Sequence, residues 1–134
     1  MSDERRSDER RTVEAEGAPA AIGPYSHAVA SGGLLFCSGQ VPLDPDSGEI
    51  AGETAAEQAT QCLRNLEAVC EAAGTTLARA VRLTIYTTQL DRFAEINDAY
   101  ADFFTSGPPA RAAVGVAALP KGALVEIDAI VSLT

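Results

Sequence analysis

Three charged side chains near the end of the chain, Arg111, Glu126 and Asp128, have types and spacing that could serve a chemical site. Two apolar runs flank the Pro-Lys-Gly turn at 120–122, and this pattern predicts a β-hairpin. Successive side chains of a strand point to opposite faces, so placing the valines and isoleucines on the core face sends all three charges to the other. We therefore expect a guanidinium and two carboxylates on one face of this hairpin.

That charged face has two interpretations from pattern alone. A half-buried sheet normally carries charges on its exposed face, which favours a plain solvated surface. Two features upstream favour a site instead. Tyr25 ends a segment punctuated by proline and glycine, and the pair Ser38-Gly39 ends an apolar strand. A glycine within a strand often marks the close approach of a ligand or of another backbone.

The elements that must position these residues alternate between strands and helices. A capping box from Thr54 to Glu57 begins a helix that we expect to end at Gly74, and apolar spacing predicts a second helix over about 91–104. Strands are predicted at 28–30, 34–41 and 81–86, ahead of the closing pair. The order β-β-α-β-α-β-β predicts an α+β sandwich, with one mixed sheet covered on one face by two helices.

The helices leave the second face of the sheet uncovered, and we expect Arg111 and Glu126 on it. An uncovered sheet face must either be polar or pack against another subunit. We therefore expect the chain to form an oligomer.

The length of 134 residues indicates one domain preceded by a tail. Residues 1–17 are polar, contain a duplicated Ser-Asp-Glu-Arg-Arg motif and have almost nothing to bury, so we expect them to be disordered. Residues 18–134 then form the single folded domain.

Composition excludes several classes of function. The net charge is −9 and the isoelectric point is about 4.4, which argues against non-specific nucleic-acid binding because that binding needs clustered lysine and arginine. No apolar run reaches the length of a membrane span, and the amino terminus is too charged for a signal peptide. We expect a soluble, cytoplasmic protein without a membrane partner.

The residues that most often bind metals or form disulfides are few. The three cysteines, Cys37, Cys62 and Cys70, include no close pair, and we expect buried, reduced thiols. His27 is the single histidine of the sequence. We therefore expect no metal site.

Several separated motifs resemble the reactive-intermediate (enamine/imine) deaminase family of the YjgF/RidA type, also described as endoribonuclease L-PSP. The resemblance covers about residues 18–134. The motifs are Ile-Gly-Pro-Tyr-Ser at 22–26, Phe-Cys-Ser-Gly-Gln at 36–40, Pro-Ala-Arg-Ala-Ala-Val at 109–114, Leu-Pro-Lys-Gly at 119–122 and Val-Glu-Ile-Asp at 125–128.

This resemblance implies both an architecture and an activity. It implies a chorismate-mutase-like α+β fold and a homotrimer, in which three sheets face inward and a ligand cleft lies at each subunit interface. It also implies hydrolysis of reactive 2-imino and enamino acids, such as 2-aminoacrylate and 2-iminobutyrate, to 2-oxo acids and ammonia. No cofactor is implied.

The resemblance also implies roles for individual residues. Arg111 corresponds to the arginine that binds the substrate carboxylate, for which its planar guanidinium is suited. Glu126 corresponds to the carboxylate that positions the attacking water. Tyr25, Ser38, Gly39 and Asn97 correspond to residues that line the cleft.

Three further positions carry expectations of a different kind. Ala113 stands where many relatives have a cysteine, which excludes thiol chemistry at that position. His27 stands where many relatives have glutamine, and we expect it at the surface or the rim of the cleft. For Asp128 we expect a structural role as the partner of a basic side chain.

Two alternatives to the deaminase remain. The same Arg111 would serve a non-catalytic trimer that binds 2-oxo acids or other small carboxylates as a sensor or regulator. RNA cleavage is the second alternative, and the acidic composition, the lack of a basic stripe and the lack of a histidine pair argue against it.

Overall fold

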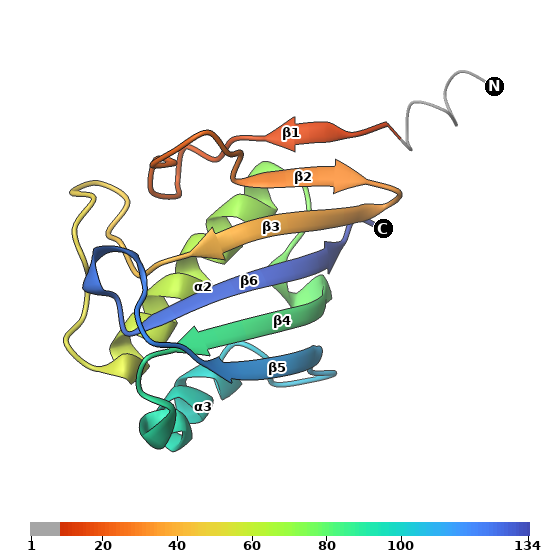
Figure 1. The fold of residues 1–134 in the computed structure, drawn as a ribbon. Helices are drawn as coiled ribbons and strands as arrows, with labels where there is room; N and C mark the ends of the chain where they lie inside the picture. The colour runs from red at the N-terminus through yellow and green to blue at the C-terminus, as the bar shows by residue number, and fades with distance from the viewer. Residues whose placement is uncertain (1–8) are drawn as a thin grey trace.

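A mixed sheet of six strands, covered on one face by two helices, forms the body of the molecule (Figure 1). The computed structural model describes residues 9–134. The strands are β1 (Arg11–Val13), β2 (Ala28–Ser31), β3 (Leu34–Gln40), β4 (Ala80–Thr87), β5 (Ala110–Gly115) and β6 (Val125–Ser132), and the α-helices are α2 (Ala55–Ala72) and α3 (Phe93–Ala101). Short 3-10 turns lie at Leu77–Arg79, Leu90–Arg92 and Pro120–Gly122. The predicted α+β fold, with both helices on one face of a mixed sheet, is confirmed.

Helix α2 begins where its capping box predicts. The Thr54 hydroxyl accepts a hydrogen bond from the backbone N–H of Glu57, and the Glu57 carboxylate accepts one from the N–H of Thr54, each at 3.1 Å. These bonds satisfy donors that the first helical turn leaves free. Beyond the last turn, Gly74 has a φ of +84°, a conformation that glycine adopts without strain.

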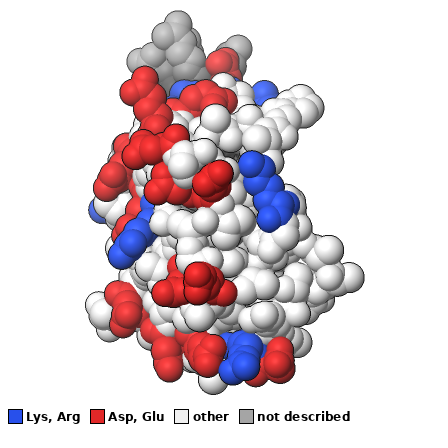
Figure 2. All heavy atoms as spheres, turned by 90° about the vertical axis from the view of Figure 1, so that its left-hand side faces the viewer, with Lys and Arg blue, Asp and Glu red and all other residues white. Residues whose placement is uncertain are grey.

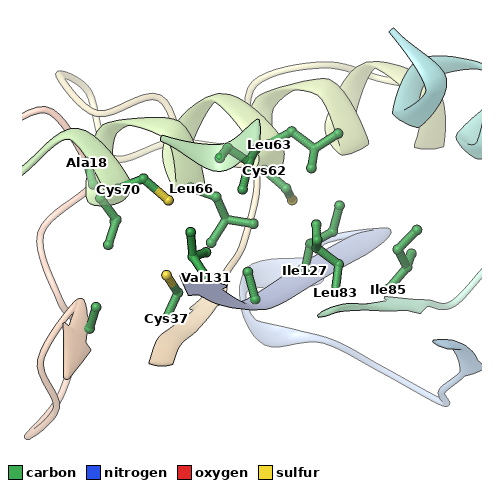
Figure 3. Packing of buried hydrophobic residues seen from close by; sticks show 14 of the residues in the cluster. Ala18, Cys37, Cys62, Leu63, Leu66, Cys70, Leu83, Ile85, Ile127 and Val131 are labelled. Carbon is green, nitrogen blue, oxygen red and sulfur yellow. The ribbon is translucent and has the colours of Figure 1, made fainter. Parts of the chain in front are cut away.

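The core lies between α2 and the sheet (Figure 3). Leu63 and Leu66 of the helix pack against Leu83 of β4 and Ile127 of β6, and all four side chains are fully buried. Burying an aliphatic side chain of this size stabilises the fold by roughly 1.5–3 kcal/mol. This packing fixes which face of β6 points away from the helices.

The predicted closing hairpin is wrong. Strand β6 lies between β3 and β4 and is antiparallel to both, whereas β5 pairs in parallel with the outer edge of β4. The segment 116–124 therefore crosses the end of β4 instead of making a tight turn. Strand β6 has alternating large apolar side chains, and the central position buries that whole row and pairs its backbone on both edges.

This pairing places Arg111 and Glu126 on opposite faces of the sheet. Arg111 lies in register with Leu83, which points into the helix-covered core. Glu126 lies in register with Tyr86 on the open face, and Asp128 shares that face two residues further along β6. The expectation of one shared face is therefore correct for the two carboxylates and wrong for the guanidinium.

Part of the expected disordered tail belongs to the fold. Residues Arg11–Val13 form β1, which pairs antiparallel with β2, and the side chains of Val13 and Ala15 are buried. The expectation of disorder is therefore wrong for residues 11–17. The first eight residues, to which the same expectation applied, lie outside the described part of the chain.

His27 is buried, which corrects the expectation of a surface position. Its Nδ1 accepts a hydrogen bond from the backbone N–H of Ala15 at 2.8 Å, and its Nε2–H donates to the carbonyl oxygen of Pro19 at 2.7 Å. These two bonds define one neutral tautomer. Through these two hydrogen bonds, the imidazole links the segment after β1 to the start of β2.

The three cysteines are free and buried, as predicted. Among residues 9–134, no helix combines the length and the apolar composition needed to cross a membrane.

Candidate functional site

A pocket of about 490 Å³ opens at the end of β3 and contains four of the six predicted site residues. Those four are Glu126, Tyr25, Ser38 and Gly39. Apolar side chains complete the wall, and they are Ile22, Val41 and Pro120.

A bulge in β3 creates the space for the Glu126 carboxylate. The pairing of β3 with β6 runs from Cys37 opposite Ala129 to Gln40 opposite Ile127, so β3 has one residue more than its partner over this stretch. A Cβ atom added to Gly39 would lie only 2.1 Å from Glu126 Oε2. The carboxylate therefore rests directly on the backbone of Gly39, and a side chain at this position would displace it.

The other two polar residues of the pocket are held by the backbone of the preceding segment. The Ser38 hydroxyl donates to the carbonyl oxygen of Ser26 at 2.7 Å, and the Ser38 N–H donates to the carbonyl oxygen of His27 at 3.0 Å. The Tyr25 hydroxyl lies 3.4 Å from the backbone N–H of Ile22. These contacts fix the wall while leaving oxygen lone pairs available to a ligand.

Burial raises the pKa of the Glu126 carboxyl group, and the negative charge of Asp128 raises this pKa further. A carboxyl group with a raised pKa can exchange a proton with a ligand nearer to neutral pH than an exposed glutamate can.

Asp128 is bound by a phenol. Its Oδ2 accepts a hydrogen bond from the Tyr86 hydroxyl at 3.1 Å. The partner of Asp128 is therefore a phenol and not the expected basic side chain. The negative charge of Asp128 in turn contributes to a raised pKa of Tyr86, behind the effect of burial. Asp128 therefore influences the Glu126 site through its charge from a fixed position.

The other two predicted residues, Arg111 and Asn97, form a separate group at the sheet edge. The Arg111 Nη1 donates to Asn97 Oδ1 at 2.8 Å. The guanidinium also lies over two aromatic rings of α3, 5.1 Å from the centroid of Phe93 and 4.9 Å from that of Tyr100. These contacts hold the plane of the guanidinium and leave most of its N–H donors free for an anion.

Phe93 and Tyr100 are site residues that the sequence reasoning did not identify. Their spacing along α3 is also that of a buried helix face, so the sequence alone does not mark them as part of a site. Together with Asn97 they lie at positions i, i+4 and i+7, a spacing that puts all three on one side of a helix. This spacing can be read from the sequence. That the three side chains surround Arg111 follows only from the position of Arg111 on the helix-covered face of the sheet.

Within one chain the six predicted residues thus form two groups. One group offers a carboxylate in an apolar pocket on the open face, and the other offers a guanidinium on the opposite face at the edge strand β5. The first can exchange protons and hold water, and the second can bind an anionic group.

Known proteins resemble this chain over nearly its whole length. The sequence pattern of the family described as Endoribonuclease L-PSP matches residues 15–133. The RutC family protein y4sK of Sinorhizobium fredii is 52% identical over 122 residues, which are 91% of this chain and 97% of that protein. A human protein named 2-iminobutanoate/2-iminopropanoate deaminase is 41% identical over 121 residues, which are 90% of this chain and 88% of that protein.

The fold has a close counterpart among solved structures. The crystal structure of the YjgF gene product of Escherichia coli superimposes with a TM-score of 0.88 at 42% sequence identity, covering 92% of this chain and 99% of that one. On the pattern match, the curated relatives and this structural likeness together, the chain belongs to the endoribonuclease L-PSP family, the YjgF/RidA family that its sequence motifs resemble.

Proposed function

We propose that this protein hydrolyses 2-imino and enamino acids, such as 2-iminobutyrate and 2-aminoacrylate, to 2-oxo acids and ammonia. The observation that carries the proposal is the Glu126 carboxylate, seated on Gly39 in a pocket where burial raises its pKa. The name of the human relative, a 2-iminobutanoate/2-iminopropanoate deaminase, supports the same class of substrate.

The proposed reaction divides the work between the two groups. Arg111 binds the substrate carboxylate through N–H donors that Asn97 leaves free. Glu126 takes a proton from a water molecule, whose oxygen attacks the carbon of the protonated imine to give a neutral tetrahedral carbinolamine. Glu126 then gives this proton to the amino group, and as the carbon–nitrogen bond breaks the hydroxyl proton passes back to Glu126, so that ammonia and the 2-oxo acid leave.

This mechanism requires the two groups to meet between copies of the chain, because one chain holds them on opposite faces. We propose a homotrimer in which the β5 edge of one copy covers the Glu126 pocket of the next. The open face supports an interface, since the side chains of Phe36 and Val114 are 44% and 40% exposed there.

The test is the decay of an imine generated in situ. An amino-acid oxidase or a threonine dehydratase would supply 2-iminobutyrate, and the release of 2-oxobutyrate would be followed with and without the protein. We expect Glu126→Gln to lower the turnover about 100-fold or more, the usual contribution of a general acid–base. We expect Arg111→Ala to lower kcat/KM, with a raised KM.

Exposed residues of the same types provide the controls. Glu49→Gln and Arg64→Ala change exposed charges outside both groups, and we expect wild-type rates for them. No acceleration by the wild-type protein, or full activity in both site variants, would refute the proposed reaction.

A carboxylate-binding protein without turnover is the second candidate. It is favoured by the fact that the Arg111 group is complete within one chain and needs no contribution from Glu126. Calorimetry with 2-oxobutyrate distinguishes the two, because binding with no imine turnover would favour this candidate.

RNA cleavage remains a weaker candidate, although the family description includes the word endoribonuclease. Acidic side chains spread over the face seen in Figure 2, with few basic ones between them. Such a surface repels the phosphate backbone. RNA degradation that co-purifies with the wild-type protein and vanishes in a point mutant would favour this candidate.

A further inference from the structure

Two cysteines face one another across the interface between the helices and the sheet. Cys37 lies on the helix-facing side of β3, and Cys70 lies in the last turn of α2. Both side chains are buried, and Figure 3 shows their sulfur atoms pointing toward each other. The sequence separates these residues widely, so only the packing of α2 on β3 makes them a pair.

The third cysteine has a different environment. Cys62 lies two turns earlier on the same helix, and its thiol donates to the carbonyl oxygen of Val125 at 3.5 Å. It is as deeply buried as Cys70. The chain therefore contains a thiol pair and, in the same helix, an unpaired thiol that serves as a reference.

The pair differs from Cys62 in acidity. The facing Cys37 thiol lowers the pKa of Cys70, and the facing Cys70 sulfur, together with burial, raises the pKa of Cys37. Burial, and after it the negative charge of Glu126, raises the pKa of Cys62 well above its ordinary value. Since a thiolate is the form that reacts with oxidants, Cys70 is the most reactive of the three sulfurs once an oxidant reaches it.

We propose that Cys37 and Cys70 are an oxidation site, at which a hydroperoxide converts the facing thiols into an intrachain disulfide. The proposal does not depend on the proposed reaction at Glu126. The location of Cys70 in the final turn of α2 gives the oxidant a route, because the last turn of a helix opens more readily than its middle.

The chemistry balances with the peroxide as the two-electron oxidant. The Cys70 thiolate attacks one peroxide oxygen, the oxygen–oxygen bond breaks, and Cys70 becomes a sulfenic acid while hydroxide leaves. The Cys37 sulfur then attacks the Cys70 sulfur, the disulfide forms, and the second oxygen leaves as water with the remaining proton. Two thiols and one hydrogen peroxide give one disulfide and two waters.

The disulfide would fasten β3 to α2 at the edge of the candidate site. Cys37 immediately precedes Ser38 and Gly39, the bulge that supports Glu126. The link between residues 37 and 70 also closes a long loop, which restricts the unfolded chain. Oxidation should therefore stabilise the fold and stiffen one wall of the pocket.

The experiment uses the full chain, freed of reductant and treated with hydrogen peroxide. We expect the intact mass to fall by about 2 Da, the loss of two hydrogens in a disulfide, and peptide mapping to link Cys37 to Cys70. Alkylation of the unfolded protein should then label Cys62 alone. We expect the melting temperature to rise by about 10 °C and to return to its starting value with a thiol reductant.

Substitutions at each cysteine give matched controls. Cys62→Ala keeps the pair, and we expect the same mass loss and the same rise in melting temperature. Cys37→Ala and Cys70→Ala each remove the pair, and we expect neither change. Mapping of the wild-type protein decides the question even if these two variants fold poorly.

Three results would overturn the proposal. They are an unchanged mass with three thiols still alkylated, the addition of oxygen to single cysteines without a disulfide, and a disulfide that involves Cys62 or joins two chains.

Discussion

At the scale of single residues, the clearest constraint is the contact between Gly39 and Glu126. An alanine at position 39 would place its Cβ 2.1 Å from Glu126 Oε2, so the carboxylate would have to leave its position. We expect Gly39→Ala to lower imine turnover about 100-fold, the loss that a displacement of about 1 Å can cause. Steady-state kinetics with 2-iminobutyrate measures this effect.

Gly17 provides the control for that substitution. A Cβ there meets only the Cβ of Ala68 at 3.4 Å, an ordinary contact. We expect Gly17→Ala to retain wild-type turnover. Equal activity in both alanine variants would mean that the position of the carboxylate does not matter to the reaction.

The second prediction at this scale concerns Asp128, whose charge raises the pKa of Glu126. Asp128→Asn removes that charge, while the amide oxygen can still accept the hydrogen bond from Tyr86. The pKa of Glu126 should therefore fall. We expect the acidic limb of the kcat/KM profile to move to lower pH, because Glu126 acts as a base in its ionised form.

The groups that face Glu126 allow a change in its pKa to be attributed to the charge of Asp128. Ser38 and Gly39 from β3 and Pro120 from the 3-10 turn face it without a charge, and Tyr86 from β4 faces it as a phenol. The exposed Glu71 on α2 gives the control, and Glu71→Gln should leave the profile unchanged. An acidic limb that stays in place in Asp128→Asn would contradict the role of this charge.

The raised pKa of Glu126 also has a consequence for stability. The folded chain holds this proton more tightly than the unfolded chain, so the free energy of unfolding falls as pH rises from the unfolded pKa through the raised folded pKa. Above the folded pKa, the ionised Glu126 carboxylate therefore lowers the free energy of unfolding. We expect Glu126→Gln to be more stable than the wild type at pH 7 by urea denaturation, at the cost of the expected loss of turnover.

At the scale of elements, His27 joins β1 and its following segment to the sheet. His27→Leu would leave the Ala15 N–H and the Pro19 carbonyl without partners, and both are held by the buried imidazole. We expect a loss of roughly 2–4 kcal/mol in the free energy of unfolding, measured by urea denaturation. Hydrogen exchange at the Ala15 amide should accelerate at the same time.

Glutamine is the informative replacement at this position, since its amide carries both an acceptor and a donor. We expect His27→Gln to retain more stability than His27→Leu, by about 1 kcal/mol for each hydrogen bond that it restores. The opposite order would show that the volume of the imidazole matters more than its hydrogen bonds.

The elements also show what the sequence could and could not predict. Helix α2 was predictable because its capping box and its apolar spacing are local signals, and the pocket residues Ser38 and Gly39 were indicated by a glycine within an apolar strand. The partner of a strand is not a local signal. Alternation along β6 predicts a strand and its two faces, but not that β3 and β4 lie on either side of it.

The error at Arg111 has the same origin. In β5 the alanines and glycine around Arg111 carry almost no apolar pattern, and the prediction used Val114 as the core residue. Val114 is exposed on the open face, opposite Tyr86. The face of Arg111 is set by its register with the buried Leu83, a long-range contact that no short window of sequence contains.

At the scale of the whole molecule, the separation of Arg111 from Glu126 is the main functional fact. A chain with both groups on one face could work alone. This chain places the guanidinium at the β5 edge on the helix-covered face and the carboxylate in a pocket on the open face. The proposed activity therefore belongs to an assembly, and the assembly can be tested by mixing inactive variants.

Co-expression of Arg111→Ala with Glu126→Ala, each with its own affinity tag, gives mixed assemblies. If each site takes its arginine from one copy and its glutamate from the next, every mixed trimer has both groups intact at one of its three sites. We expect the doubly tagged fraction to recover about one third of the wild-type imine turnover, whereas each variant alone stays near the background rate. Sites built within one chain would give no recovery, because every chain would then lack one of the two groups.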